Sequence, residues 1–193
     1  MRQQVLNEIT QIFEESIAVK KETLLQNSRE IQRAVDVIVR ALRRNKKLLI
    51  FGNGGSAADS QHIAAEFIGR FQKERASFPA IALTTDSSAL TALGNDYGFE
   101  HVFSRQMEGL GRKGDVALAI STSGMAANVI KAVQQARAMG ITVIALTGRD
   151  GGRLAPLADV KIVVPSSSTA RIQESHVCIV HCVCACVENI LAS

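Results

Sequence analysis

A histidine and a glutamate one helical turn apart, His62 and Glu66, are the residues whose types and spacing first suggest chemistry. Because each helical residue turns the chain by about 100°, positions four apart share one face, and one small ligand or metal ion could contact both. Such pairs are also common on solvated helix faces. A glycine-rich loop that precedes the pair by about two to three turns favours the functional interpretation.

This loop has the sequence Gly-Asn-Gly-Gly-Ser at 52–56 and follows the apolar run 48–51. The pattern predicts a strand, a tight loop and a helix. Glycines let the backbone approach a ligand, and the first amides of the helix lie at the positive end of its dipole. The glycine spacing matches neither a dinucleotide fingerprint nor a P-loop. We therefore expect a site for polar or anionic groups, but not a general nucleotide site.

A second candidate anion site is the run Ser121, Thr122, Ser123 and Gly124, which follows another apolar stretch. Hydroxyl groups and free helix amides can hold a phosphate together. The alternative is ordinary helix capping, since serine and threonine are preferred at helix starts. One hydroxyl would be enough for a cap, so three in a row favour the anion site.

The last apolar segment, 170–191, predicts a helix that carries Gln173 and His181. A histidine in an apolar helix is more often a hydrogen-bonded core residue than a ligand. Together with His62 and Glu66, however, these two residues complete a set of nitrogen and oxygen donors that could share one site.

The same helix carries the four cysteines, which are Cys178, Cys182, Cys184 and Cys186. Their spacing lacks the separated pairs of a zinc site, so we expect buried thiols, with the line 178, 182 and 186 packed in the core.

The order of the predicted elements indicates the fold class. Strands are expected at 48–51, 78–83, 115–120, 141–146 and 160–164, with helices between them, including 86–93, 99–110, 125–139 and 150–157. Strands that are apolar throughout and alternate with helices form a parallel sheet covered on both faces. We therefore predict a flavodoxin-like, doubly wound α/β sandwich with five parallel strands, in which ligands bind beyond the carboxyl ends of the strands.

The N-terminal part has helical spacing of apolar residues over 3–25 and again over 28–44. Two extra helices have no place inside an alternating sheet, so we expect the helical pair, within 1–45, to serve oligomer packing. The remainder, 46–193, forms the α/β sandwich. A length of 193 residues suits a single domain with a full core.

Composition limits the possible function classes. Hydrophobic residues make up 47% of the chain and charged residues 21%, which is typical of a globular protein. The N-terminus lacks a signal-peptide core and no apolar run approaches a membrane span, so a cytoplasmic protein without membrane partners is expected. Basic residues between Arg40 and Lys47 are interpreted as a helix-end cap. With seven Phe, one Tyr and no Trp, stacking platforms are scarce, and no direct nucleic-acid binding is expected.

Five segments together resemble the sugar isomerase (SIS) domain family, and within it the branch of sedoheptulose 7-phosphate isomerases; they are 51–66, 94–98, 121–124, 146–152 and 171–176. The resemblance covers nearly the whole chain. It implies an isomerase that converts sedoheptulose 7-phosphate to D-glycero-manno-heptose 7-phosphate, a step toward the heptose of bacterial lipopolysaccharide. It also implies a cytoplasmic homotetramer with active sites made from more than one subunit.

The resemblance assigns roles to individual residues. Glu66 and His181 match the catalytic positions, and a zinc ion, one per subunit, would be held by His62, Glu66, Gln173 and His181. The matching substrate contacts are Asn53, Gly54, Gly55, Glu66, Asn95, Asp96, Ser121, Thr122, Ser123 and Gln173. The chemistry agrees, because aldose–ketose isomerisation through an enediol needs a base and an acid, and a cation can polarise the carbonyl.

Two residues depart from the isomerase pattern. Met125 and Ala126 follow the hydroxyl run, where the family usually has a polar residue and then a serine that helps to hold the phosphate. One lost donor to a phosphate would cost about 1.5–3 kcal/mol.

The family also contains a non-catalytic branch that binds the bacterial replication initiator, and sugar-phosphate-sensing modules attached to further domains. The presence of both Glu66 and His181 in apolar helices, where each needs a partner, favours the enzyme.

Overall fold

A single parallel sheet forms the centre of the computed structural model, which describes residues 1–192. The strands lie in the order β2-β1-β3-β4-β5. Their bounds are β1 Leu48–Gly52, β2 Ala80–Ala82, β3 Val116–Ser121, β4 Thr142–Gly148 and β5 Val160–Val164. Every residue of β1 and β3 is buried, as expected for central parallel strands with both faces covered. The predicted flavodoxin-like sheet is confirmed.

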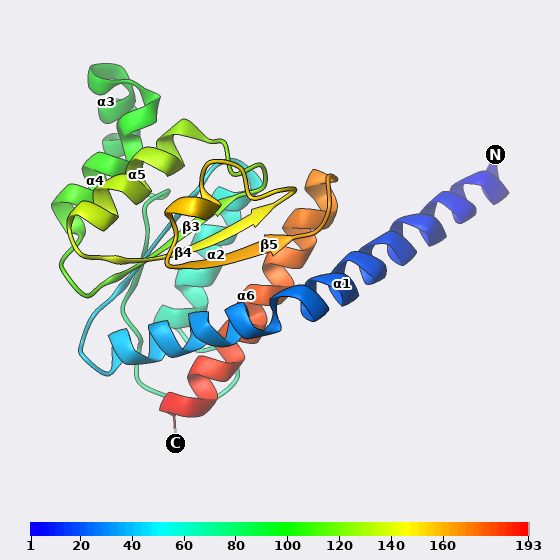
Figure 1. The fold of residues 1–193 in the computed structure, drawn as a ribbon, viewed down its shortest axis with the longest axis horizontal. Coiled ribbons are helices and arrows are strands. Elements are labelled where there is room, and N and C mark those ends of the chain that lie inside the picture. The colour runs from blue at the N-terminus through cyan, green and yellow to red at the C-terminus, as the bar shows by residue number, and fades with distance from the viewer. Residues whose placement is uncertain (193) are drawn as a thin grey trace.

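Helices cover both faces of this sheet (Figure 1). Their bounds are α1 Arg2–Leu42, α2 Gly55–Ile68, α3 Ser87–Tyr97, α4 Val102–Leu110, α5 Ala127–Ala138 and α6 Thr169–Leu191. Side chains from α1, α2 and α6 pack in the hydrophobic cluster on one face, and α4 and α5 in the cluster on the other. The helix expected at 150–157 is only a short 3₁₀ turn, Ala155–Leu157, because Gly151 and Gly152 have positive φ angles and Pro156 lacks an N–H.

The N-terminal segment is one continuous helix, so the expected pair of helices is wrong. The polar residues near Asn27, which resemble a helix boundary in the sequence, remain helical because Asn27 has tertiary partners. Its side-chain amide donates to the carbonyl of Val163 at 3.0 Å and accepts from the Val163 N–H at 3.1 Å. Asn27 thereby occupies the open edge of β5, where a strand would otherwise leave unpaired backbone groups.

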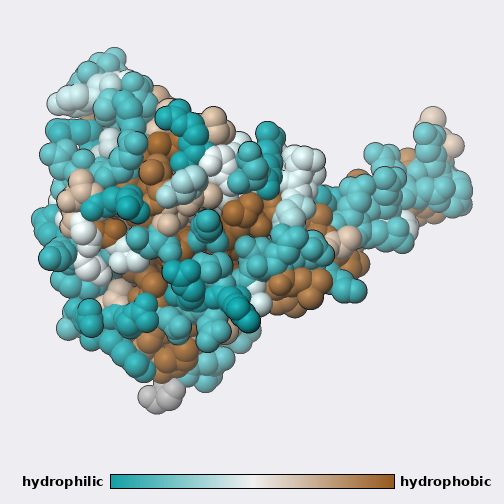
Figure 2. Space-filling model, viewed as in Figure 1, coloured by the Kyte–Doolittle hydropathy of each residue, from teal (hydrophilic) through white to brown (hydrophobic). Residues whose placement is uncertain are grey.

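The first half of α1 projects well beyond the body of the molecule (Figure 1). Apolar side chains lie along this projecting part, and Figure 2 shows some of them as brown patches on an otherwise mostly hydrophilic surface. The exposed residues are Val5, Leu6, Ile9, Ile12, Phe13 and Ile17. Their spacing places them on one stripe of the helix, which has no partner among the described residues.

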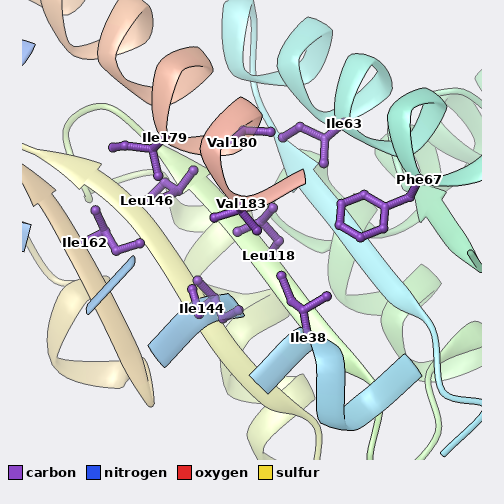
Figure 3. Close-up of a pocket in the computed structure, with 11 residues that line it drawn as sticks. Ile38, Ile63, Phe67, Leu118, Ile144, Leu146, Ile162, Ile179, Val180 and Val183 are labelled. Carbon is purple, nitrogen blue, oxygen red and sulfur yellow. The ribbon is translucent and has the colours of Figure 1, made fainter. Parts of the chain in front are cut away.

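A small apolar cavity lies between the sheet and the helices of the first face. Figure 3 shows aliphatic side chains from α1, α2, α6 and the strands pointing into it, with Phe67 at one side. Its volume is about 20 Å³, and its lining offers no polar side chain. A buried water needs polar partners, so this cavity is a packing defect of the core and not a ligand site.

Helix α6 packs against the sheet through residues that include Ile172, Val180 and Val187. By length and composition alone α6 could cross a membrane, but a single such helix is weak evidence, and 44% of its most apolar part is buried inside the protein. The cysteine expectation is partly wrong. Only Cys184 is buried, whereas Cys178 and Cys182 are exposed. The rotation of α6 on the sheet explains this difference, because it turns Cys178 and Cys182 toward a groove beside α1.

Candidate active site

The glycine-rich loop and the hydroxyl loop lie side by side at the carboxyl edge of the sheet. Strands β1 and β3 are neighbours, with Gly52 opposite Ile120, and the loops leave from these ends. A Cβ on Gly52 would lie 2.7 Å from the carbonyl oxygen of Ile120, so only glycine permits this approach. The strand order reverses between β1 and β3, which is where doubly wound sheets bind ligands.

Helix α2 begins immediately after Gly54, whose φ of +56° favours a residue without a Cβ. The N–H groups of Ser56 and Ala57 bond to the carbonyls of Asn53 and Gly54, both at 3.0 Å. The amides of Gly54 and Gly55 are therefore the ones available to an anion at the positive end of the helix.

Asn53 is held by a residue that the sequence analysis missed. Its side-chain amide forms two reciprocal hydrogen bonds with that of Asn128, both 2.8 Å long. Asn128 is buried and lies in the first turn of α5, just after the hydroxyl loop. The pair thus ties the two loops together. An asparagine in the first turn of a helix that follows a Ser/Thr loop is the only signal in the sequence.

The hydroxyl loop is itself constrained. Ser121 ends β3 and is only 7% exposed, while Thr122 and Ser123 are half-buried. The Ser123 Oγ accepts a hydrogen bond from the Met125 N–H at 3.2 Å. The N-cap of α5 is Ala126, whose side chain cannot accept a hydrogen bond from the first turn of this helix.

The donor residues expected from the two helices meet in space. His62 Nε2 lies 3.0 Å from Glu66 Oε1 and 3.4 Å from His181 Nε2. The two imidazole rings form an edge-to-face contact, with centroids 5.0 Å apart and planes at 84°. One ligand atom from each of the three residues lies within 4.8 Å of the others. The structure therefore brings His62, Glu66 and His181 together.

The remaining predicted residues are distributed around this cluster. Gln173 lies against the glycine-rich loop, where a Cβ on Gly55 would overlap its side-chain amide. Asn95 and Asp96 are exposed on α3, and the Asn95 Nδ2 donates to Asp96 Oδ1 at 2.8 Å. No described contact links these two residues to the cluster.

A comparison with known proteins identifies the family. The model of the SIS domain matches residues 11–148 of the chain. The chain belongs to the SIS domain family.

Several relatives of this SIS domain are phosphoheptose isomerases. That of Aquifex aeolicus (strain VF5) is 51% identical over 187 residues, covering 97% of this chain and 98% of the relative. That of a Nitratiruptor species is 58% identical over 153 residues, covering 79% and 82%. The solved structure of phosphoheptose isomerase from Neisseria gonorrhoeae superposes with a TM-score of 0.91 at 47% identity, covering 96% of this chain and 99% of that one.

Within the SIS domain, a second carboxyl group lies near the histidine pair. Asp59 precedes His62 by one turn of α2, and its Oδ2 atom is buried without a hydrogen-bond partner among the described residues. Burial raises the pKa of Asp59, and the charge of His62 lowers it to a lesser extent.

The donor set of the SIS domain fits a zinc ion. Two imidazole nitrogens and one carboxylate oxygen are ligands that zinc takes in catalytic sites, where three protein ligands leave one position open. The three ligand atoms lie close enough to share one ion. Gln173, the fourth expected ligand, is eight residues before His181 on α6, and the structure shows it beside Gly55.

Proposed function

We propose that this protein is a phosphoheptose isomerase, which interconverts sedoheptulose 7-phosphate and D-glycero-manno-heptose 7-phosphate for the heptose of lipopolysaccharide. The observation that carries the proposal is the cluster of Glu66 and His181 around His62. The glycine-rich loop and the hydroxyl loop, which we expect to bind the phosphate, lie at the same edge of the sheet. The similarity to phosphoheptose isomerases over nearly the full chain supports the choice of substrate.

In the proposed reaction, Glu66 is the base. Its carboxylate removes a proton from the carbon beside the ketose carbonyl and returns it to the neighbouring carbon, with an enediol between the two steps. His181 is the acid that gives a proton to the former carbonyl oxygen and takes one from the adjacent hydroxyl. The hydrogen bond between Glu66 and His62 keeps the carboxylate directed toward the cluster.

The phosphate would be held at the far end of the substrate by the hydroxyls of Ser121, Thr122 and Ser123 and by the amides of Gly54 and Gly55. Binding energy from this remote group positions the reacting carbons. We propose the remaining contacts for the sugar hydroxyls: Asn53, Asn95, Asp96, Gln173 and Glu66. Asn95 and Asp96 are exposed on α3.

We propose that zinc is held by His62, Glu66, Gln173 and His181, once Gln173 turns from Gly55. When bound, zinc would polarise the substrate carbonyl and favour loss of the neighbouring proton. The three clustered ligand atoms support this assignment.

We further propose a cytoplasmic homotetramer. The apolar stripe on the projecting half of α1 supports it, because an isolated helix segment of this kind gains stability only by packing. The groove between α1 and α6, which Leu24, Ile31 and Cys182 line, continues this apolar surface toward the body. A second copy of the chain is the partner that would cover both.

The test is an NMR assay of sedoheptulose 7-phosphate with purified, zinc-loaded protein. Glu66→Gln and His181→Ala should each lower kcat by about 10²–10⁴-fold, because each removes one proton-transfer group. His101→Ala, which alters a histidine beside Lys131, is the matched control and should keep full activity. A folded wild type without turnover would sink the proposal and favour the alternative of a non-catalytic protein that binds the replication initiator.

A further inference from the structure

The loop between α2 and β2 is held by a buried carboxylate from α6. Glu188 is 2% exposed and accepts hydrogen bonds from the N–H groups of Phe71, Gln72 and Lys73 at 2.9, 2.7 and 2.8 Å. The Arg75 Nε donates to the same carboxylate at 3.1 Å. A buried carboxylate with four donors fixes the backbone of this loop relative to α6.

Glu188 is ionised in this environment. Burial opposes the charge, but the donors from Lys73, Gln72 and Phe71, together with the charge of Arg75, hold the pKa of Glu188 below its usual value. A glutamate in the apolar part of α6 is therefore explained by the loop that it binds, and not by the substrate cluster.

Arg75 connects the same loop to the end of α2. Its side chain is 5% exposed, and the guanidinium group lies 4.0 Å above the ring of Phe78. It donates hydrogen bonds to the carbonyl oxygens of Glu66, Phe67, Gly69 and Ala76. The carbonyls of Glu66 and Phe67 lie in the last turn of α2, so Arg75 fixes the helix end that carries Glu66.

Phe71 brings this loop into contact with the cluster. Its ring centroid lies 5.4 Å from that of His181, with the planes tilted by 43°. His62 contacts the same imidazole edge to face. The His181 ring thus lies between Phe71 and His62. The backbone N–H of Phe71 is held by Glu188, which lies two helical turns after His181 on α6.

We infer that Phe71, Arg75 and Glu188 are positioning residues, which set the orientation of the His181 imidazole relative to Glu66. Helices α2 and α6 carry one of the two proposed proton-transfer groups each, and the loop bonds to both helices. The inference deepens the proposed isomerase and rests on it for the kinetic part of its test.

The decisive variant is Phe71→Ala, because it removes the ring contact and keeps the backbone bond to Glu188. We expect kcat to fall by about 10–100-fold with KM changed less than about twofold, since misplacing a reacting group by about 1 Å has this effect. Phe71→Tyr retains the ring and should restore kcat. Gln72→Ala, at the neighbouring exposed position, is the matched control and should behave as wild type.

A readout independent of turnover separates this inference from the proposed function. Crystal structures of Phe71→Ala, Phe71→Tyr and Gln72→Ala would give the distance between the Nε2 atoms of His62 and His181, which is 3.4 Å in the wild type. The Phe71→Ala structure should show a rotated or split His181 ring, and the other two should not. If Phe71→Ala leaves both the His181 ring and kcat unchanged, the inference is overturned. If the wild type has no isomerase activity but the His181 ring is displaced in Phe71→Ala, only the proposed function is overturned. Glu188→Gln is unsuitable alone, because it would loosen the whole loop.

Discussion

The Nε2 atoms of His62 and His181 lie 3.4 Å apart, although 119 positions separate the two residues in the chain. The same His62 atom lies 3.0 Å from Glu66 Oε1. Two imidazole nitrogens can approach this closely when one carries a proton or when both face a cation, because two lone pairs repel each other. The geometry therefore leads to a direct prediction about zinc.

Zinc should stabilise the folded protein through this cluster. At a free zinc concentration of about 100 times Kd, binding adds about 2.7 kcal/mol, which raises Tm by about 5–10 °C in a protein of this size. His62→Ala and His181→Ala should abolish most of the rise, measured by differential scanning calorimetry. His101→Ala, which leaves the cluster intact, should keep it; an equal rise in all four proteins would show that zinc binds elsewhere.

Gly55→Ala should impair activity with little effect on folding. A methyl group at this position would overlap the Gln173 amide, which is the end of a flexible side chain and can move away. We expect a change of less than about 1 kcal/mol in the free energy of unfolding, but at least about tenfold lower kcat/KM because the methyl group would crowd the proposed phosphate contact at the Gly55 amide. Gly109→Ala in α4, where a Cβ meets nothing within 4 Å, should instead stabilise by up to about 1 kcal/mol and leave activity unchanged.

Ala126→Ser should improve both stability and phosphate binding. A serine at the N-cap of α5 can accept a hydrogen bond from the first turn, which contributes about 1 kcal/mol. Its hydroxyl can also donate to the phosphate, and a hydrogen bond of about 1.4 kcal/mol corresponds to a tenfold lower KM. Urea denaturation and steady-state kinetics test the two effects. Ala138→Ser, at the exposed end of the same helix, should show neither; an unchanged KM for Ala126→Ser would place the phosphate away from this helix start.

A charge in the α1 stripe should break the oligomer. Burial of a large apolar side chain contributes about 1.5–3 kcal/mol, and a buried carboxylate costs more. Ile9→Glu combined with Phe13→Glu should therefore lower the mass measured by light scattering to that of a monomer. The body retains its own core and should remain folded by circular dichroism. Gln4→Glu, on the opposite side of the helix, is the control, and a monomeric wild type would contradict the proposed assembly.

Acid should destabilise the protein through His176. This residue is fully buried, and burial lowers its pKa to about 4, although its hydrogen bond to the Thr147 carbonyl at 3.0 Å opposes the shift. Because the unfolded chain has a pKa near 6.5, the unfolded state binds more protons below that pH. Stability is therefore lost as the pH falls from about 6.5 toward 4, by about 2 kcal/mol at pH 5. Urea titrations between pH 7 and 5 should show this slope, and His176→Gln should remove it.

The apolar runs predicted the five strands and their parallel direction, because buried parallel strands need continuous hydrophobicity. The continuous α1 helix was not predicted, since the signal of a boundary near Asn27 is local. The bonds between Asn27 and Val163 that keep the segment helical join residues far apart in the chain. Likewise, the line of Cys178 and Cys182 resembles a buried stripe in the sequence, but the rotation of α6 on the sheet places it outward.

Local sequence was sufficient to predict the parts of the site: a glycine-rich turn before a helix, a hydroxyl loop after a strand, and His62 and Glu66 on one helical face. These parts follow from backbone geometry, which depends on a few neighbouring residues. The folded chain was needed to show that His181 completes the cluster, that Asn128 holds Asn53, and that Glu188 fixes the loop carrying Phe71. Each of these contacts joins elements that are distant in the chain. It depends on how the helices pack on the sheet, and the sequence of a single segment does not determine that packing.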